Sequence, residues 1–237
     1  MNAPVASRIV AVLGMHRSGT SWLAGSLEEL GLEMGEVSTR DPHNLKGNRE
    51  NPVLMEIHEG VLHDNDGSWK RPPANAKWSD VRSAALAAHI ADMNSRFPQG
   101  WGFKDPRALL ILAEWLRQAP QLSRIGIFRH PLAVHRSLAA RSERFDEGRS
   151  IGLWCAYNER LAAEHRRAPF PMLSFDVGAD ELFGALAVAA AGLGLPAADR
   201  SSGFFDAGLV HNKPDDEAIP RACRGLWEYL EAQVVRA

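Results

Sequence analysis

The sequence has only two cysteines among 237 residues, Cys155 and Cys223. They stand far apart in segments with helical periodicity, and neither lies in a spacing typical of metal or redox sites. We therefore expect reduced thiols in or near the core. The zinc-binding pattern His-Glu-x-x-His is also missing, so no metal site is expected.

Long apolar runs and an excess of one charge are missing as well. No stretch approaches the roughly 20 apolar residues that a membrane-spanning helix needs. Residues 1–7 lack the basic-then-apolar layout of a secretory signal, so we expect a cytoplasmic protein. The net charge of −2 gives no bulk attraction to nucleic acid or to a membrane surface, and neither is expected as a partner.

The most informative stretch is the glycine-bounded segment 14–22, Gly-Met-His-Arg-Ser-Gly-Thr-Ser-Trp. It follows an apolar run at 9–13, typical of a buried parallel strand, and precedes leucines at helical spacing that end at Gly31. A strand, a tight loop and a helix in this order direct backbone N–H groups and the positive end of a helix dipole at one point. That geometry suits a phosphate group, although a tight turn without a ligand is the simpler alternative.

The loop is close to an ATP-binding Walker A loop but lacks its lysine. Thr20 follows Gly19 where that pattern has Lys, and the cation stands inside the loop at Arg17. Without the Lys, the loop is poorly equipped to hold a triphosphate with its metal ion, although it suits a single 5′-phosphate. A P-loop kinase that uses ATP therefore stays an alternative only.

This loop resembles the 5′-phosphosulfate loop of sulfotransferases that use 3′-phosphoadenosine-5′-phosphosulfate (PAPS). The family has a second motif, an Arg at a strand end followed eight residues later by a Ser in the next helix, which together bind the 3′-phosphate. Arg129 and Ser137 have this spacing, behind the apolar run 125–128. The resemblance implies that the chain binds PAPS and its product adenosine-3′,5′-bisphosphate (PAP) without a metal ion.

Further segments match, in order, the pattern of short bacterial proteins of this family. They are Lys46-Gly47-Asn48-Arg49-Glu50, residues 101–107 (Trp-Gly-Phe-Lys-Asp-Pro-Arg), Arg129-His130-Pro131, Ser174-Phe175-Asp176, and residues 204–211 ending in His211. One departure is Asn48-Arg49, where aromatic residues are usual in the family, and it leaves the shape of the acceptor side open.

Apolar runs that read as strands alternate with segments of helical periodicity. We expect strands near 9–13, 101–104, 124–128 and 171–175, one helix through 109–116, and a loop over 141–150. The alternation predicts an α/β fold with a central parallel sheet between helices, and the resemblance implies the P-loop NTPase-like, three-layer form. One domain is expected over 1–237, with variable acceptor-side segments at about 33–79 and 141–150.

The resemblance also assigns roles to single residues. Nucleotide binding falls to Arg17, Ser18, Gly19, Thr20, Ser21, Trp22, Arg129, Ser137 and His211. Trp22 would stack on adenine, or it is a core residue on a helix face. Arg17 and Lys104 would stabilise charge on the transferred group and on the leaving oxygens.

An acceptor hydroxyl needs a base within hydrogen-bond reach. Glu50 is the first candidate for this catalytic base, followed by His43 and then His58. Glu50 also precedes a helix start at Asn51-Pro52, where a carboxylate can merely suit the helix dipole.

The function that the resemblance implies is the transfer of a sulfuryl group from PAPS to a hydroxyl or amine of a small molecule or carbohydrate. Two alternatives stay open, the P-loop kinase and a nucleotide-binding module without catalysis. The identity of the acceptor and the oligomeric state do not follow from the sequence.

Overall fold

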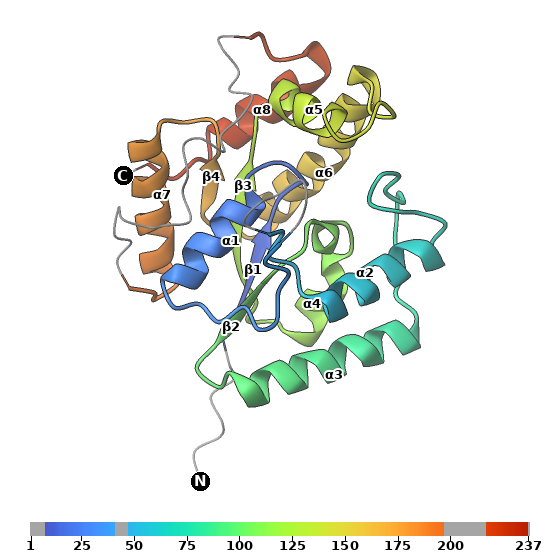
Figure 1. The fold of residues 1–237 in the computed structure, drawn as a ribbon, viewed down its shortest axis with the longest axis vertical. Helices are drawn as coiled ribbons and strands as arrows, with labels where there is room; N and C mark the ends of the chain where they lie inside the picture. Colours follow the sequence, from blue (N-terminus) through green and yellow to red (C-terminus); the bar gives the residue numbers. More distant parts are fainter. Residues whose placement is uncertain (1–7, 41–46, 197–216, 237) are drawn as a thin grey trace.

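A computed structural model describes residues 8–40, 47–196 and 217–236. Its centre is a four-stranded sheet in the order β2-β1-β3-β4 (Figure 1). The strands are β1 (Ile9–Leu13), β2 (Trp101–Lys104), β3 (Ser123–Phe128) and β4 (Met172–Ser174). All three strand pairs are parallel, with Val12 opposite both Lys104 and Ile125, and Phe128 opposite Ser174. The predicted α/β fold with a central parallel sheet is confirmed.

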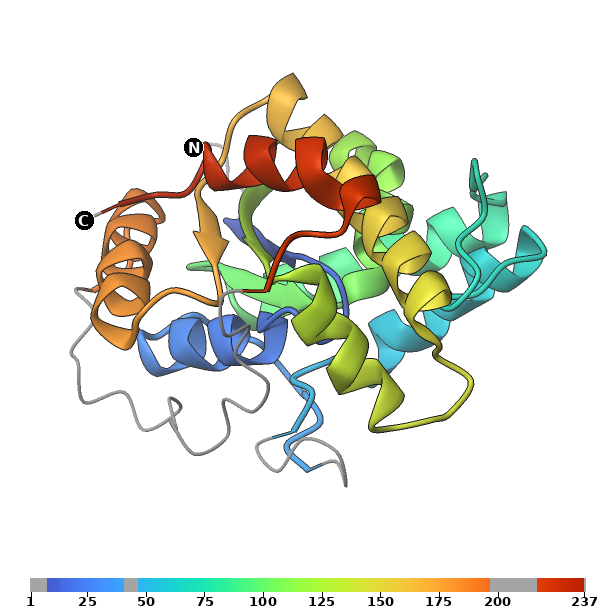
Figure 2. The same ribbon diagram turned by 90° about the horizontal axis from the view of Figure 1, so that it is seen from above.

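The helices cover both faces of the sheet (Figure 2). On one face, α1 (Thr20–Glu29) and α7 (Ala179–Gly192) pack on Val10, Val12, Ile125 and Ile127. A larger core on the other face includes side chains from the remaining helices. These helices are α2 (Pro52–Asp64), α3 (Asp80–Arg96), α4 (Leu112–Gln118), α5 (Pro131–Ala139), α6 (Glu147–Arg167) and α8 (Arg224–Glu231). The three layers follow from this division.

Caps explain where several helices begin. Asn51 caps α2 by accepting hydrogen bonds from the N–H groups of Val53 and Leu54, with Pro52 at the first position, as the sequence predicted. Ser79 caps α3 in the same way. Both helices therefore start where local chemistry alone would start them.

Two expectations about elements were wrong. The helix expected through 109–116 is a 3₁₀ segment, η1 (Pro106–Leu110), followed by the short α4, with Ile111 between them outside helical geometry. The expected loop over 141–150 is shorter, because Asp146 accepts a hydrogen bond from Arg149 N–H and starts α6 at Glu147. The stretch was predicted to be a loop because it is charged, and Asp146 was not recognised as the N-cap of a helix.

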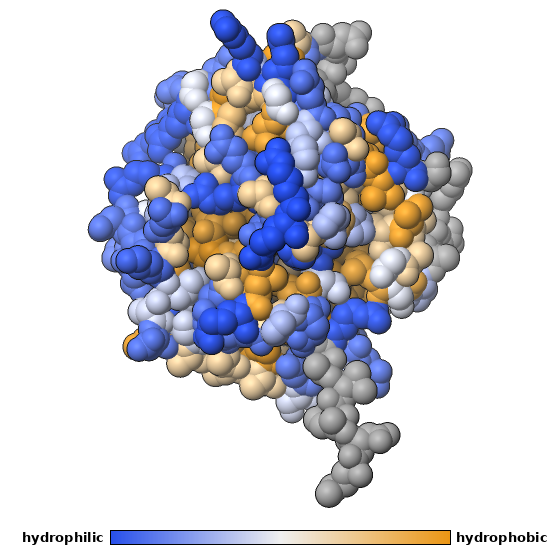
Figure 3. All heavy atoms as spheres, turned by 180° about the vertical axis from the view of Figure 1, so that it is seen from behind, coloured by the Kyte–Doolittle hydropathy of each residue, from blue (hydrophilic) through white to orange (hydrophobic). Residues whose placement is uncertain are grey.

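The face of the molecule opposite to that of Figure 1 shows charged and polar side chains with hydrophobic patches between them (Figure 3). Among the large hydrophobic residues, Val53, Val81 and Val188 are exposed. Within the ranges that the structure describes, no helix has the length and apolar character to cross a membrane.

Gly14 follows β1, where the backbone passes close to β3 and to the start of α1. A Cβ added there would lie 2.3 Å from the carbonyl oxygen of Ile127 and 2.9 Å from Cγ2 of Thr20. We expect Gly14→Ala to lower the free energy of unfolding by about 1–3 kcal/mol, because backbone atoms of β3 cannot move aside cheaply. Chemical denaturation followed by circular dichroism measures this.

Gly152→Ala is the matched control. Gly152 lies on the exposed side of α6 with nothing within 4 Å of an added Cβ, so the substitution should stabilise the helix by up to about 1 kcal/mol. Equal stability of the two variants would contradict the close approach at Gly14.

Candidate functional site

All four strands end at one edge of the sheet, and polar residues stand at or after the ends of three of them. Gly14 follows β1, Lys104 ends β2, Arg129 follows β3, and Phe175-Asp176 follow β4. In a parallel sheet the carboxyl ends lie together, and this edge is where ligands of open α/β sheets bind. The predicted site residues at these positions are thus brought to one place.

The loop between β1 and α1 is shaped by left-handed backbone and by a close aromatic contact. Arg17 has φ +70° and Gly19 has φ +88°. A Cβ on Gly19 would lie 2.3 Å from the ring of Phe175, so only glycine fits. Ser18 is fully buried, and its hydroxyl has no hydrogen-bond partner in the described part of the chain. An orphaned buried hydroxyl of this kind fits a loop that receives an anionic ligand.

Arg17 joins the two motifs that the sequence suggested separately. Its Nε donates a hydrogen bond of 2.7 Å to Oγ of Ser137, across 120 residues of sequence. Ser137 lies in α5 and is buried. The loop after β1 and the helix after β3 therefore meet directly at two of the predicted site residues.

Arg129 is buried and held from several sides. Its Nε donates to Oδ1 of Asp176 at 3.2 Å, and its guanidinium lies 5.2 Å from the ring centre of Phe175. The other oxygen of Asp176 accepts a hydrogen bond from the N–H of His130. Burial lowers the pKa of Arg129, and the charge of Asp176 opposes this shift. Asp176 thus fixes both the direction of Arg129 and the start of α5.

Trp22 lies in the core between α1 and α7. It is 7% exposed, and its ring centre is 6.0 Å from that of Phe175 and 6.1 Å from that of Phe183. This position agrees with the core alternative, and its stacking on adenine stays a prediction. The ring of Phe175 thus lies against Trp22, Gly19 and the guanidinium of Arg129.

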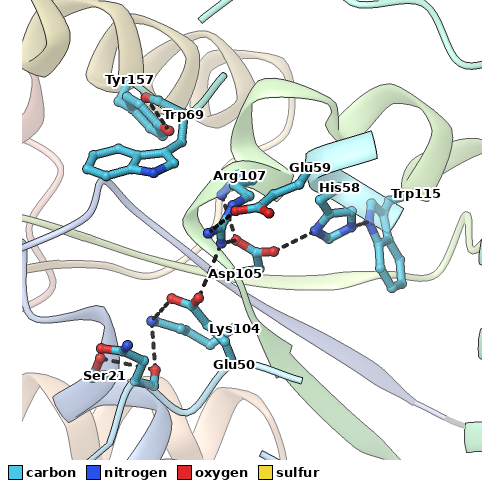
Figure 4. A network of polar contacts seen from close by, with 11 residues as sticks. Ser21, Glu50, His58, Glu59, Trp69, Lys104, Asp105, Arg107, Trp115 and Tyr157 are labelled. Carbon is cyan, nitrogen blue, oxygen red and sulfur yellow. Dashed lines mark hydrogen bonds and ion pairs between the residues drawn. The ribbon is translucent and has the colours of Figure 1, made fainter. Parts of the chain in front are cut away.

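Glu50 and Lys104 form a buried ion pair close to Ser21 at the start of α1 (Figure 4). Nζ of Lys104 lies 2.6 Å from Oε1 of Glu50 and also donates to the carbonyl of Asn48 at 2.7 Å. The same carbonyl accepts from Oγ of Ser21 at 3.1 Å. Burial lowers the pKa of Lys104, while the charge of Glu50 counteracts the shift.

Arg107 extends this cluster on its far side. It contacts Glu50 at 3.2 Å, Asp105 at 2.8 Å and Glu59 at 2.8 Å. Burial would lower the pKa of Arg107, but the charges of Asp105 and Glu50 outweigh it and raise the pKa. Glu50 therefore lies between two cations and anchors the side chain of Lys104.

His58 lies in the core rather than at the site. Its Nδ1 lies 2.9 Å from Oδ2 of Asp105, and its Nε2 accepts from the indole N–H of Trp115 at 2.9 Å. Both ring nitrogens are thus used in a fully buried network. This arrangement leaves His58 no free atom for an acceptor hydroxyl.

His16 lies in the loop between β1 and α1, and the sequence gave it no role of its own. Trp69, from the segment 65–79, stacks on its ring with centres 4.4 Å apart, and Tyr157 meets it edge-on at 5.8 Å. Neither ring nitrogen has a hydrogen-bond partner within the described ranges. Burial, and then the charges of Arg107 and Lys104, hold the pKa of His16 well below its ordinary value. His16 is therefore neutral at pH 7.

The two tryptophans of the segment 65–79 differ in their surroundings. Trp78 donates its indole N–H to the carbonyl of Ile111 and packs on the core. The carbonyl of Trp69 accepts from the hydroxyl of Tyr157 at 3.2 Å, so α6 holds this tryptophan over His16. The stack of Trp69 on His16 could not be predicted from the sequence, because 53 positions separate the two residues.

Two predicted site residues, His43 and His211, lie outside the described residues, as does Lys46. Their roles stay predictions.

Two solved sulfotransferase domains share this architecture. The sulfotransferase domain of the Synechococcus PCC 7002 olefin synthase gives a TM-score of 0.59 at 17% identity, covering 96% of each chain. The sulfotransferase domain from the curacin biosynthetic pathway gives 0.52 at 13% identity, covering 98% of this chain and 100% of that one. No family model matches the sequence, and no curated protein matches it. At these identities the likeness shows the fold, and the three-layer fold that the resemblance implied is confirmed.

The pairing of Asp105 makes stability depend on pH in acid. Burial would raise the pKa of Asp105, but the hydrogen bond from His58 and the charge of Arg107 outweigh it and hold the pKa far below 3.8. Because the folded-state pKa is depressed, the stabilisation is fully present above the unfolded value and is lost as pH falls below it. We expect Asp105→Asn to cost about 3–5 kcal/mol of unfolding free energy at pH 7.

The cost should shrink as the pH is lowered from 5 toward 2, since the wild type loses the same stabilisation there. Denaturant titrations at several pH values measure it. Asp92→Asn is the control, because Asp92 pairs with Arg96 on the surface of α3 and should cost less than about 0.5 kcal/mol. A pH-independent difference between wild type and Asp105→Asn would refute the linkage.

Proposed function

We propose that this chain, which has the fold of sulfotransferase domains, transfers a sulfuryl group from PAPS to a hydroxyl or amine of a small-molecule or carbohydrate acceptor. The observation that carries the proposal is the hydrogen bond between Arg17 and Ser137. It brings a single-phosphate loop and an Arg–Ser motif into one site, as expected for a ligand with separate 5′ and 3′ phosphates. ATP has no 3′-phosphate for the second motif to recognise.

The donor would be held by residues from three strand ends. The N-terminus of α1 begins directly after Gly19, so its free N–H groups would face a phosphate bound in the loop. Ser18, Thr20 and Ser21 add hydroxyl groups there. Arg129, fixed by Asp176, would bind the 3′-phosphate together with Ser137. The unpartnered hydroxyl of Ser18 supports this fit. When bound, PAPS supplies the sulfuryl group and the leaving bisphosphate.

Cations in a site largely shielded from water would stabilise the charge that develops during transfer. Arg17 lies inside the phosphate loop, and Lys104 reaches the adjacent segment 47–50. Preorganised positive groups of this kind lower the barrier most where solvent is excluded. Lys104 is 3% exposed, which satisfies that condition.

The acceptor would lie on the side of Glu50, His16 and Trp69. Glu50 remains the proposed proton acceptor, although its ion pairs with Lys104 and Arg107 must loosen for it to take a proton. His16 is neutral and offers hydrogen bonds to an acceptor hydroxyl. Trp69 covers this imidazole, so a ring-bearing acceptor would replace or extend the stack.

The kinase alternative is weaker at two positions. Thr20 occupies the place of the phosphate-binding Lys, and the end of β3 carries Arg129 rather than an acidic residue. Asp105 at the end of β2 is acidic, but it is already paired with Arg107 and His58.

Calorimetric titration of the purified chain with PAP, and separately with ATP and magnesium, tests the donor. We expect PAP to bind more tightly. Arg129→Ala should weaken PAP binding by about 1.5–3 kcal/mol, because a charged hydrogen bond to the 3′-phosphate is lost, and should leave adenosine-5′-phosphate binding nearly unchanged.

Arg124→Ala is the matched control. Arg124 lies near the start of the same strand, remote from the carboxyl ends, and pairs with Glu164. It should change neither affinity. Equal losses for both nucleotides in Arg129→Ala would remove the 3′-phosphate assignment, and tighter binding of ATP would favour the kinase.

Glu50→Gln tests the catalytic base while keeping the shape of the side chain. If Glu50 accepts the proton, kcat should fall by about 10²–10⁴-fold while the Kd for PAP stays within a few-fold. The control is Glu59→Gln, because Glu59 also pairs with Arg107 but is 55% exposed. Transfer at the wild-type rate in Glu50→Gln would give the role to another residue, and no transfer to any acceptor by the wild type would favour a non-catalytic nucleotide-binding module.

A further inference from the structure

The two cysteines of the chain meet in space. Cys155 and Cys223 are 68 residues apart in sequence, yet their sulfurs lie 3.6 Å from each other. Cys155 lies within α6 and is half-buried, whereas Cys223 stands directly before α8 and is buried. Both are thiols in this structure. Because the chain has no other cysteine, the pair is its only opportunity for an intramolecular disulfide.

The surroundings of this pair lead to the proposed nucleotide site. Trp154, next to Cys155, donates its indole N–H to the carbonyl of Arg129 at 2.8 Å. Trp227 of α8 packs edge-on against His130 at 5.4 Å, and against Phe128 at 5.3 Å. The two cysteines therefore lie where the last helix meets the elements that carry Arg129.

A second contact holds the chain before Cys223 to the start of α5. The carbonyl of Glu217 lies 3.2 Å from Nε2 of His130, and its carboxylate forms an ion pair with Arg136. Arg136 and Glu217 are both about one-third exposed or more, so this ion pair is weak in water. A covalent link at Cys223 would hold the same segment far more firmly.

We propose that Cys155 and Cys223 form a reversible dithiol–disulfide site that reacts with peroxides and, when oxidised, fastens the C-terminal helix to α6. The Cys155 thiolate attacks one peroxide oxygen, which breaks the O–O bond, releases water after protonation and leaves a sulfenic acid. The Cys223 sulfur then attacks the Cys155 sulfur, which forms the S–S bond and expels a second water. In sum, two thiols and one hydrogen peroxide give one disulfide and two waters.

The order of these steps follows from the different surroundings of the two thiols. The hydrogen bond from Cys223 lowers the pKa of Cys155, which is also the more accessible sulfur. That same hydrogen bond, together with burial, raises the pKa of Cys223. Attack on an oxidant requires a thiolate that the oxidant can reach, so Cys155 is the attacking residue and Cys223 the resolving residue.

Closing the bond needs only a small movement. The sulfurs must approach from 3.6 Å to about 2.05 Å, and α6 and α8 already pack against each other. The disulfide would close a loop spanning 68 positions, and long loops gain most from such a link.

The experiment treats the reduced 237-residue chain with one equivalent of hydrogen peroxide, then blocks the remaining thiols and determines the mass of the uncleaved protein. We expect a monomer lighter by two hydrogen atoms, with no blocked thiols and a single cross-linked peptide pair containing Cys155 and Cys223. Its Tm should exceed that of the reduced protein by roughly 5–15 °C, and dithiothreitol should reverse the shift.

Single substitutions separate the two roles. Cys223→Ser should stop at the sulfenic acid of Cys155, which dimedone captures, whereas Cys155→Ser should resist the peroxide because Cys223 is buried. If either serine variant fails to fold, the mass and Tm of the wild type still decide. Two blockable thiols after treatment, a sulfinic acid at Cys155, or a disulfide between chains would each overturn the proposal. None of these readouts depends on sulfuryl transfer.

Discussion

The parallel pairing of four strands is the constraint on which the rest of the structure depends. Because β2, β1, β3 and β4 run in one direction, every crossover returns the chain to the opposite edge and every strand ends at the same edge. Residues far apart in sequence, such as Arg17 and Ser137, can then touch. The residues of the proposed nucleotide site come together for this reason, since they lie in the segments that follow β1, β3 and β4.

The second constraint is the burial of charge beside that edge. Lys104, Asp105 and Arg107 are at most 5% exposed, together with Glu50. Removing such charges from water costs free energy, and their mutual attraction offsets this desolvation penalty only if every partner is present. The cluster is therefore rigid by necessity. It fixes the direction of Lys104, which the proposed chemistry requires. It also holds Glu50 in ion pairs, which must loosen if Glu50 is to act as the proposed base.

The sequence predicted the elements that have strong local signals. The strand at β1, the Asn51 cap, and the loop between Gly14 and Gly19 depend on neighbours in the chain, and they were found. The break at Ile111 and the start of α6 at Glu147 were missed, because packing and a single Asp cap outweighed hydrophobic spacing.

Contacts across the fold could not be predicted from spacing. The stack of His16 on Trp69 and the meeting of Cys155 with Cys223 bring together residues whose separation carries no local signal. The placement of His58 is similar, since its two hydrogen bonds come from β2's end and from α4. A single-domain organisation and the roles of His43 and His211 stay predictions.

The segment 47–50 is held by its backbone. The carbonyl of Asn48 accepts from Ser21 and Lys104, and Ser38 exchanges main-chain hydrogen bonds with Arg49 and Glu50. These hydrogen bonds tie one short segment to α1 through Ser21 and to β2 through Lys104. The carbonyl of Asn48 is the atom at which the two meet, because it accepts from both side chains. A shift of α1 against the end of β2 would therefore break at least one of these hydrogen bonds, and the segment 47–50 links the movements of the two elements.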